Sequence, residues 1–334
     1  MLELDGSIGG GAVVRVALGL SIATGTPFRL ENARSGRPDP GLKHQHLAGV
    51  EAAAELSAAE VEGAERGSQE LVFSPGETLA EAVTAEIPTA GSVGLLLQPL
   101  WIAAAGADHE VSVTVDGGAT AGKWAPPVHY LEHVALPLLG RFGHPSSVDI
   151  RRHGFYPEGG ALVKAGFGPS DLDRIELLEQ GAVERVEGLS IASEHLKDAE
   201  VAERQRNEAR RVIAGENPSL ELDIGTRYVE ARSPGSSILL WSDTRETIVG
   251  GDQVGEKGKR AETVGREAAG ELRAAGETGA PLDAAMSDMV VPFLALAGGD
   301  VRVQEVTDHV ECNVRVANRF TEREITVEGR RLEA

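Results

Sequence analysis

The chain alternates short runs of β-type residues with alanine-rich amphipathic segments. Over 11–24, for example, Val14, Leu18 and Ile22 recur at i, i+4 and i+8 and form one apolar helix face. Regular alternation of the two kinds of segment is typical of α/β proteins. The pattern predicts helices at 11–24, 45–56, 92–105, 127–141, 194–214, 260–275 and 282–296, and strands at 70–74, 110–115, 161–165, 220–224, 237–241, 301–306 and 324–327.

One part of the chain has a different texture. Residues 171–188 are acidic and irregular, and they precede a very polar helical segment at 194–214. A length of 334 residues suits two domains, or one domain with an insertion. We therefore predict a smaller inserted domain at 183–277, with 1–182 and 278–334 forming the large domain. A weak recurring order of helix, helix, strand, strand is present without an exact sequence repeat.

Composition adds a strong charge bias. The net charge is −20, from 52 acidic and 32 basic residues, and only six of the basic residues are lysines. This balance indicates adaptation to high salt, where a Debye length of about 3 Å at 1 M screens self-repulsion. The single cysteine, Cys312, excludes an intrachain disulfide and a multi-cysteine zinc site. The charge balance therefore predicts a halophilic protein. We also expect it to be cytoplasmic, because no signal-peptide pattern begins the chain and its longest apolar stretch, 93–107, is interrupted.

A glycine-rich segment, 5–15, leads directly into the first predicted helix and carries Arg15. Glycines allow backbone N–H groups to approach a phosphate, and a helix N-terminus favours negative charge. The spacing is neither that of a Walker A loop nor that of a dinucleotide fingerprint. The segment alone is equally consistent with a tight turn that caps the helix.

Basic residues gather in the next segment, 34–46, against the acidic trend of the chain. Arg34, Arg37, Lys43, His44 and His46 fall within it, among prolines and glycines that stiffen a loop. Arginine forks suit bidentate phosphate contacts. The alternative is a solvated basic loop without a ligand.

Histidines supply the remaining candidate chemistry. His309 follows a predicted strand among polar residues, where an imidazole can serve as nucleophile, as acid or base, or as a structural group. His129 and His133 are spaced at i, i+4. We interpret this pair as part of a helix surface rather than as a metal site.

Taken together, these segments resemble the RNA 3′-terminal phosphate cyclase family in its archaeal form. The resemblance runs from Leu4 to about Phe320. It is carried, in order, by 5–15, 31–47, 90–98, 126–131, 155–160, 255–259, 287–289 and His309. It implies an α/β fold with a large domain of three repeated sheet-plus-two-helix units and a smaller inserted α/β domain.

The resemblance also implies an activity. The family uses ATP to convert an RNA 3′-phosphate into a 2′,3′-cyclic phosphate, through a covalent histidine–AMP intermediate and an adenylated RNA end. This is ligase-type nucleotidyl transfer in RNA processing. The implied partners are ATP and RNA 3′-phosphate ends, with neither a membrane nor a stable protein partner.

Residue roles follow from the matching positions. His309 matches the nucleophile, and Arg15, Arg34, Arg37 and Gln45 match positions that hold phosphates. The implied nucleotide-contacting residues are Gln98, Ala285, Met286, Ser287, Asp288 and Met289.

The implied cofactor is a divalent metal ion, Mg²⁺ or Mn²⁺. Its ligands stay unassigned, because the glycine loop is two residues shorter than usual and lacks the family's metal-holding glutamate. Two other functions remain open at this point. One is a catalytically inert, cyclase-like RNA-binding protein of ribosome assembly, and the other is an enzyme that acts on a small phosphorylated metabolite.

Overall fold

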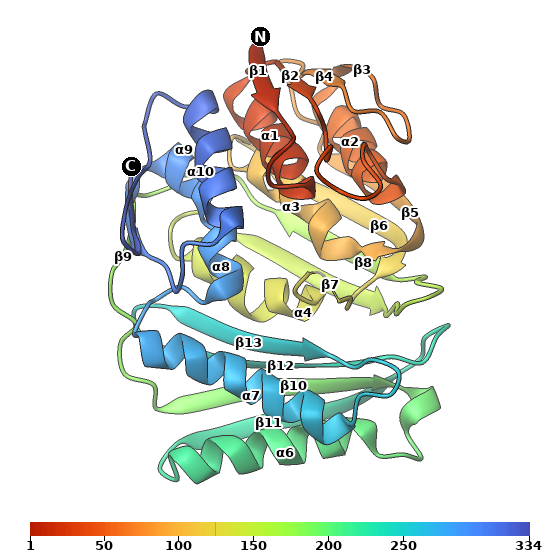
Figure 1. Cartoon of the computed structure of the whole chain (residues 1–334), viewed down its shortest axis with the longest axis vertical. Helices are drawn as coiled ribbons and strands as arrows, with labels where there is room; N and C mark the ends of the chain where they lie inside the picture. The colour runs from red at the N-terminus through yellow and green to blue at the C-terminus, as the bar shows by residue number, and fades with distance from the viewer. Residues whose placement is uncertain (124) are drawn as a thin grey trace.

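A computed structural model describes residues 1–123 and 125–334, which form four four-stranded sheets with helices packed on them (Figure 1). In each sheet one pair of neighbouring strands is parallel and the other pairs are antiparallel. The chain is thus a mixed α/β protein, as its sequence pattern predicts.

Residues 2–74 form the first unit. Its elements are β1 (Leu2–Asp5), α1 (Gly11–Thr24), β2 (Phe28–Glu31), α2 (His44–Ser57), β3 (Glu60–Glu62) and β4 (Leu71–Ser74). The sheet order is β1-β2-β4-β3, and β1 runs parallel to β2. Two neighbouring parallel strands need a crossover connection, because the chain has to return to the end of the sheet where the first strand began. The helix α1 forms that connection here.

Residues 82–167 repeat the same order. The elements are β5 (Ala82–Ser92), α3 (Val93–Ala104), β6 (Val111–Ala119), α4 (Val128–Tyr130), η1 (Leu131–Ala135), α5 (Leu136–Gly140), β7 (Ser146–Arg152) and β8 (Leu162–Phe167). The sheet order is β5-β6-β8-β7. The helix predicted at 127–141 is therefore present, but η1 is a turn of π-helix in its middle.

The third unit is split along the chain. It consists of β9 (Ile175–Leu177), α8 (Ala284–Met289), α9 (Val291–Ala297), β14 (Gly299–Arg302), α10 (Asp308–Phe320), β15 (Thr326–Glu328) and β16 (Arg331–Glu333). Its sheet order, β9-β14-β16-β15, matches the other two units strand for strand. The large part of the molecule therefore contains three copies of one topology.

Residues 185–278 separate β9 from α8. This 185–278 unit contains β10 (Arg185–Ser193), η2 (Glu194–Leu196), α6 (Val201–Glu216), β11 (Glu221–Val229), β12 (Ser236–Asp243), β13 (Ile248–Val254) and α7 (Ala261–Thr278). Its sheet, β11-β10-β12-β13, lies in the lower half of Figure 1. Ile213, Ile238 and Val264 belong to a hydrophobic cluster confined to this unit. We propose that it is the inserted domain that the sequence predicts at 183–277.

One continuous core joins the three repeated units. Trp101 of α3 packs on Phe293 of α9 with ring centroids 4.6 Å apart. Phe28 of β2 meets Phe320 of α10 edge to face at 6.0 Å. Because these aromatic pairs cross between units, the helices of all three are fixed relative to one another.

Some boundaries differ from the sequence pattern. The segment predicted as one helix at 282–296 is two helices, because Pro292 cannot donate a backbone hydrogen bond and starts α9. The segment at 194–214 is helical only from Val201 after a short 3₁₀ turn. The helix α10 was not predicted. Its side chains form an apolar stripe with Val310, Val314 and Ala317 buried, so the period was present in the sequence.

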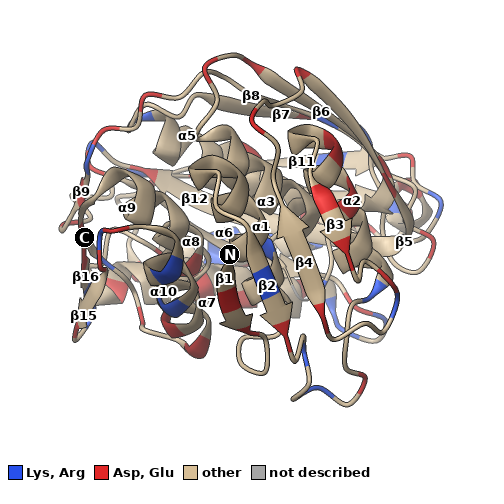
Figure 2. Ribbon diagram, turned by 90° about the horizontal axis from the view of Figure 1, so that it is seen from above, with Lys and Arg blue, Asp and Glu red and all other residues tan. Residues whose placement is uncertain are grey.

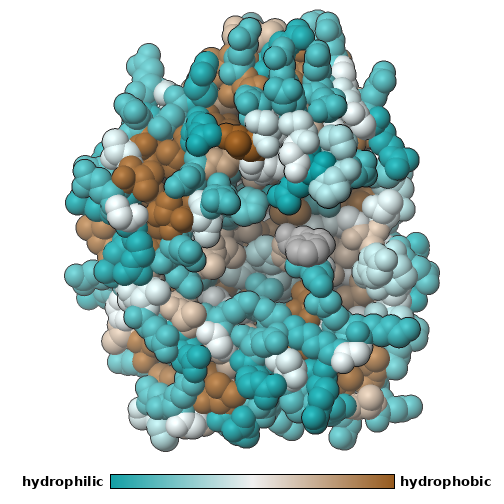
Figure 3. Space-filling model, viewed as in Figure 1, coloured by the Kyte–Doolittle hydropathy of each residue, from teal (hydrophilic) through white to brown (hydrophobic). Residues whose placement is uncertain are grey.

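The surface reflects the composition. Acidic residues occur throughout the view in Figure 2, with fewer basic residues among them. Hydrophilic residues cover most of the face in Figure 3, and apolar residues form separate patches. Among the described residues, no helix has the length and apolar character that crossing a membrane requires.

Candidate active site

The conformation of the glycine loop between β1 and α1 is fixed by its glycines and by hydrogen bonds to Asp5. Gly9 and Gly10 have φ angles of 77° and 60°, in the left-handed region that favours glycine. Asp5 accepts hydrogen bonds from the backbone N–H of Ser7 at 3.0 Å and from the Ser7 hydroxyl at 2.8 Å. These bonds lower the pKa of Asp5. The loop therefore ends in a fixed turn that exposes the N-terminus of α1.

Arg15 extends from the first turns of α1 toward the second unit. Its Nε donates a 2.7 Å hydrogen bond to Oε1 of Gln98 on α3, and Gln98 is buried. Burial lowers the pKa of Arg15 to about 10, so it stays cationic at neutral pH. Burial raises the pKa of Asp288 on α8 to about 6, although the Arg15 charge opposes the shift. Arg15, Gln98 and Asp288 thus come together from all three repeated units.

The basic segment packs against the glycine loop. Arg34, with φ 56°, donates from its backbone to Gly6 O at 3.0 Å, and its guanidinium donates to the carbonyl of Gly41 at 2.6 Å. Arg34 therefore shapes the loop as well as adding charge. Arg37 is exposed, and a β-carbon placed on Gly10 would lie 3.1 Å from one of its terminal nitrogens. Its guanidinium therefore lies over the start of α1.

His46 approaches the same helix start from α2. A β-carbon on Gly11 would lie only 2.6 Å from His46 Nε2 and 3.1 Å from a terminal nitrogen of Arg15. Burial lowers the pKa of His46 to about 4, and nearby Arg34 and Arg15 act in the same direction. The Nδ1 of His46 accepts the Lys43 backbone N–H at 3.1 Å. In the neutral ring the proton must then sit on Nε2, which presents a donor toward the glycine loop.

Gln45 lies beside this group. Gln45, His46 and Arg15 line one small cavity between α1, α2 and α3. The Gln45 side chain also lies close to Gly91, where a β-carbon would be 3.4 Å from it. The structure thus brings the predicted phosphate-holding residues Arg15, Arg37 and Gln45 to one place, and Arg34 lies in the loop that supports them.

His309 lies in the first turn of α10, after the helix cap Thr307, and its side chain is exposed. Within the described part of the chain it has no hydrogen-bonding or ion-pair partner. Cys312, one turn on, touches the glycine loop, with its Sγ 3.8 Å from the carbonyl of Ile8. Asn313 donates a 3.0 Å hydrogen bond to the carbonyl of Asp288. The start of α10 is therefore placed between the glycine loop and α8.

The predicted nucleotide-contacting stretch is the helix α8. Asp283 caps it and accepts hydrogen bonds from Met286 N at 2.9 Å and from the Tyr130 hydroxyl at 2.6 Å. Met286, Ser287 and Met289 are buried, whereas Ala285 and Asp288 are partly exposed. Ala285 and Asp288 are thus the members of the stretch whose side chains a ligand can reach in this conformation.

A cavity of 380 Å³ opens beside α8, between the repeated units and the 185–278 unit. Pro126, Ala285 and Gln304 line it from one side, and Asp252 and Glu271 line it from the other. Its volume falls in the range of small-molecule sites, about 300–1,000 Å³. Burial raises the pKa of Asp252 well above its ordinary value, and the negative charge of Glu271 adds to this shift.

The acids near the glycine loop do not form a metal cage. The Asp5 carboxylate accepts hydrogen bonds from Ser7 and Asn32, and the charge of Arg15 acts on Asp288. Within 1–123 and 125–334, three neighbouring imidazole, thiol or carboxylate ligands occur only elsewhere, at His129, Glu132 and His133. We therefore assign no protein ligand to the divalent ion that the resemblance implies, and we derive no reaction step through it.

Two participants were missed as site residues in the sequence. His46 belongs to the basic segment, and its position three residues after Lys43 at a helix start was the available signal. Asp283 was not singled out, because its contacts with Tyr130 and with Gly250 N at 2.7 Å depend on long-range folding.

Comparison with known proteins shows which family the chain belongs to. The sequence model of the family described as "RNA 3'-terminal phosphate cyclase" matches residues 7–327. The chain belongs to this family. It is 42% identical to the RNA 3′-terminal phosphate cyclase of Thermococcus kodakarensis over 98% of the chain and 95% of that protein. It is also 42% identical to the protein of the same name from Methanothermobacter thermautotrophicus, over 99% of the chain and 97% of the relative. A third relative of that name, from Methanopyrus kandleri, is 41% identical over 99% of the chain and 96% of its own length.

Proposed function

We propose that this chain converts RNA 3′-terminal phosphates into 2′,3′-cyclic phosphates with ATP, by way of a histidine–AMP intermediate. Family membership and the names of its relatives support the activity. The observation that carries the mechanism is the position of His309. Its imidazole is exposed, has no hydrogen-bonding partner among the described residues, and lies in the first turn of a helix that packs against the glycine loop and against α8.

The first step is adenylation of the protein. A nitrogen of the neutral His309 ring attacks the α-phosphorus of ATP, a P–N bond forms, and the bond to pyrophosphate breaks. Arg15, Arg37 and the His46 Nε2–H supply donors at the start of α1, where the helix dipole also favours negative charge. Donors fixed in advance stabilise charge that develops on the phosphates without reorganising.

The next two steps use the same phosphate-holding groups. An oxygen of the RNA 3′-phosphate attacks the AMP phosphorus, the P–N bond breaks, and His309 is regenerated. The RNA 2′-hydroxyl then attacks the activated 3′-phosphorus, its proton is lost to solvent, and AMP leaves as the cyclic phosphate forms. Covalent catalysis of this kind replaces one difficult displacement by easier ones, because AMP is a better leaving group than oxide.

We further propose that the nucleotide base enters the 380 Å³ cavity beside α8. Ala285 lines that cavity, and Asp288 on the same helix lies next to Arg15. The base would then lie on one side of α8 and the phosphates at the glycine loop on the other. An α-phosphate between them would be presented to the start of α10.

The test is covalent labelling of the purified chain with ATP radiolabelled in the α-phosphate. We expect protein-bound AMP that is labile to acid and resistant to hydroxylamine, as a phosphoramidate is. His309→Ala should abolish the label and keep the melting temperature of the wild type. His195→Ala changes an exposed histidine in the 185–278 unit and should label normally.

The competing hypothesis is that this chain binds RNA without catalysing a reaction. It is motivated by the shortened glycine loop, which lacks a glutamate. A folded wild-type chain that forms no AMP adduct, with either Mg²⁺ or Mn²⁺, would support that function. Covalent AMP on His309→Ala would show that the nucleophile is assigned to the wrong residue.

A further inference from the structure

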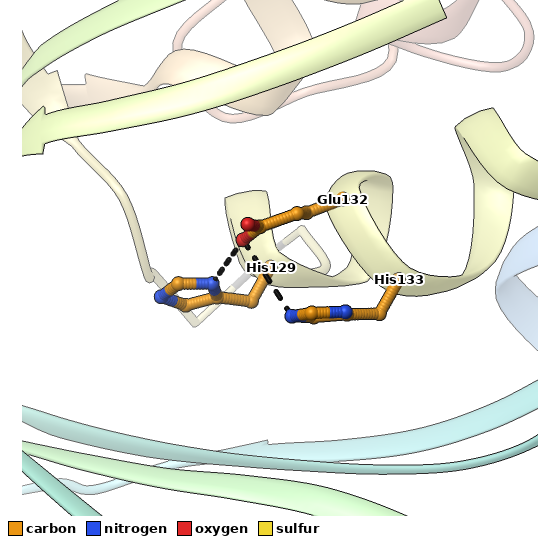
Figure 4. A group of neighbouring side chains, drawn as sticks. All are labelled: His129, Glu132 and His133. Carbon is orange, nitrogen blue, oxygen red and sulfur yellow. Dashed lines mark hydrogen bonds and ion pairs between the residues drawn. The ribbon is translucent and has the colours of Figure 1, made fainter.

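A cluster of three metal-ligating side chains lies apart from the proposed active-site groups. His129 lies in the short helix α4, and Glu132 and His133 lie in the π turn η1 that follows it (Figure 4). One ligand atom from each lies within 4.8 Å of the other two. His129 is not on the helix surface, as its spacing suggested, because its side chain is only 6% exposed.

The sequence spacing is informative in itself. Residues 129–133 read His-Tyr-Leu-Glu-His, a pattern of the form H-x-x-E-H. On a helix this spacing places both histidines on one face, and it provides zinc ligands in a class of metallopeptidases. The π turn begins inside this pattern, at Leu131, and such turns occur frequently at functional sites.

The distances suit a small ion. Glu132 Oε2 lies 2.7 Å from His129 Nδ1 and 3.6 Å from His133 Nε2. Bonds of 2.0–2.1 Å in a tetrahedral site hold ligand atoms about 3.3 Å apart. The distance from Glu132 to His133 Nε2 already agrees with this ligand–ligand distance within a few tenths of an ångström. The shorter distance, to His129 Nδ1, is that of a hydrogen bond, which must open by about 0.6 Å when an ion replaces the shared proton.

The two histidine side chains are held by burial or stacking, and the site remains accessible to an ion from solvent. The His133 ring stacks on Trp241 of β12 at 4.3 Å with an interplanar angle of 7°, which orients its Nε2 toward Glu132. Glu132 and His133 are 34% and 30% exposed, so an ion can enter from solvent. The other nitrogen of His129, Nε2, is buried without a hydrogen-bonding partner among the described residues. This nitrogen points away from Glu132, so the site uses only Nδ1 of His129.

We propose that His129, Glu132 and His133 bind a divalent transition-metal ion of the Zn²⁺ class, with a fourth position open to water. Two imidazoles and one carboxylate are ligands for such ions, whereas Mg²⁺ and Ca²⁺ prefer oxygen donors alone. The site is distinct from the divalent ion that accompanies ATP. Since His133 stacks on Trp241, a bound ion also stiffens the contact between the second repeated unit and the 185–278 unit.

The test uses the full chain without a histidine tag, freed of metal by chelation and kept in KCl. Co²⁺ and Zn²⁺ are added alone, in the absence of ATP and RNA. We expect one ion per chain, visible d–d absorption of four-coordinate Co²⁺, and a melting temperature that rises with Zn²⁺. Excess Mg²⁺ should not displace either ion.

Two variants probe the ligands, and one serves as control. His133→Gln and Glu132→Gln should each weaken Zn²⁺ binding by more than about tenfold, the smallest loss typical even of groups behind the ligands. His195→Gln removes an exposed histidine elsewhere and should bind as the wild type does. Melting of the metal-free variants establishes that they are folded.

Two results would overturn the proposal. One is a folded wild-type chain that takes up no more Co²⁺ than His133→Gln does. The other is unchanged Zn²⁺ affinity in either ligand variant. Neither result depends on the cyclase reaction, because no readout involves AMP or RNA.

Discussion

Replacing Gly11 by alanine is the sharpest test of the phosphate site. The added β-carbon would lie 2.6 Å from His46 Nε2 and 3.1 Å from a terminal nitrogen of Arg15. Ordinary contacts of a β-carbon begin at 3.4 Å, so the ring has to retreat by about 0.8 Å and the guanidinium by about 0.3 Å. Both donors would then miss the phosphate at the start of α1.

The expected loss is in rate rather than in stability. Displacing a positioning group by about 1 Å can cost about 100-fold, equivalent to about 2.7 kcal/mol of transition-state stabilisation. Alanine is the better helix former by up to about 1 kcal/mol, so α1 itself is not weakened. We predict that protein–AMP forms about 100-fold more slowly at saturating ATP, with a melting temperature close to that of the wild type.

Two further glycines make matched controls. Gly270 in α7 is remote from this site and has open space around its β-position, so Gly270→Ala should adenylate normally. Gly19 in α1 would place its β-carbon 2.6 Å from Ile102, so Gly19→Ala should melt at a lower temperature. If Gly11→Ala formed AMP–protein within about threefold of the wild-type rate, the roles of His46 and Arg15 would be refuted.

Other expectations address the loop, the pH response and the salt response. Arg37→Ala should lower turnover of 3′-phosphate RNA about tenfold or more, because a charge-assisted phosphate contact is lost; an unchanged rate would make this loop a solvated surface. Burial lowers the pKa of His144 to about 4, so the native state holds it neutral while the unfolded chain takes up a proton below about 6.5. The free energy of unfolding should therefore be highest above pH 6.5 and fall toward pH 4, by about 3 kcal/mol from this group alone. Denaturant titrations at several pH values should show a shallower dependence in His144→Gln, and an identical slope would contradict the assignment. With a net charge of −20, melting temperature and turnover at saturating RNA should both rise from about 0.1 M to about 1 M KCl; a flat or falling melting temperature would refute the salt adaptation.

Much of the fold follows from local pattern. The helix predicted at 11–24 has those bounds in the structure, because its apolar face and its flanking glycines are both local signals. The short strands β9 and β16 were not predicted. With three residues each, they are strands only because β14 lies between them, and that pairing joins distant parts of the chain.

The same contrast between local signals and long-range contacts applies to the residues of the proposed site. Arg15, Arg37 and His309 were predicted as site residues through the family resemblance, to which the glycine-rich, the arginine-rich and the His309 segments each contribute. The burial of Met286 and Ser287 could not be foreseen, because it depends on how α8 packs under α10. His129 was taken for a surface residue, but it is buried beside His153, with ring centroids 5.4 Å apart, and that contact joins positions 24 residues apart in the chain.

The split in the third unit has a consequence for the order of folding. In the first unit Leu2 pairs opposite Phe28, whereas in the third unit Ile175 pairs opposite Gly299, across a loop about five times as long. Closing the longer loop costs about 1.4 kcal/mol more in chain entropy.

A folded 185–278 unit removes most of that cost, because both its ends lie on the same side of it in Figure 1. We therefore expect the pairing of β9 with β14 to follow the folding of a unit that contributes no strand to that sheet. Asp288 on α8 and His309 on α10 lie in the same stretch of chain as β14, so we expect them to reach their places only after that pairing. The 185–278 unit would then set the timing with which the proposed active site assembles, although it does not carry the proposed nucleophile.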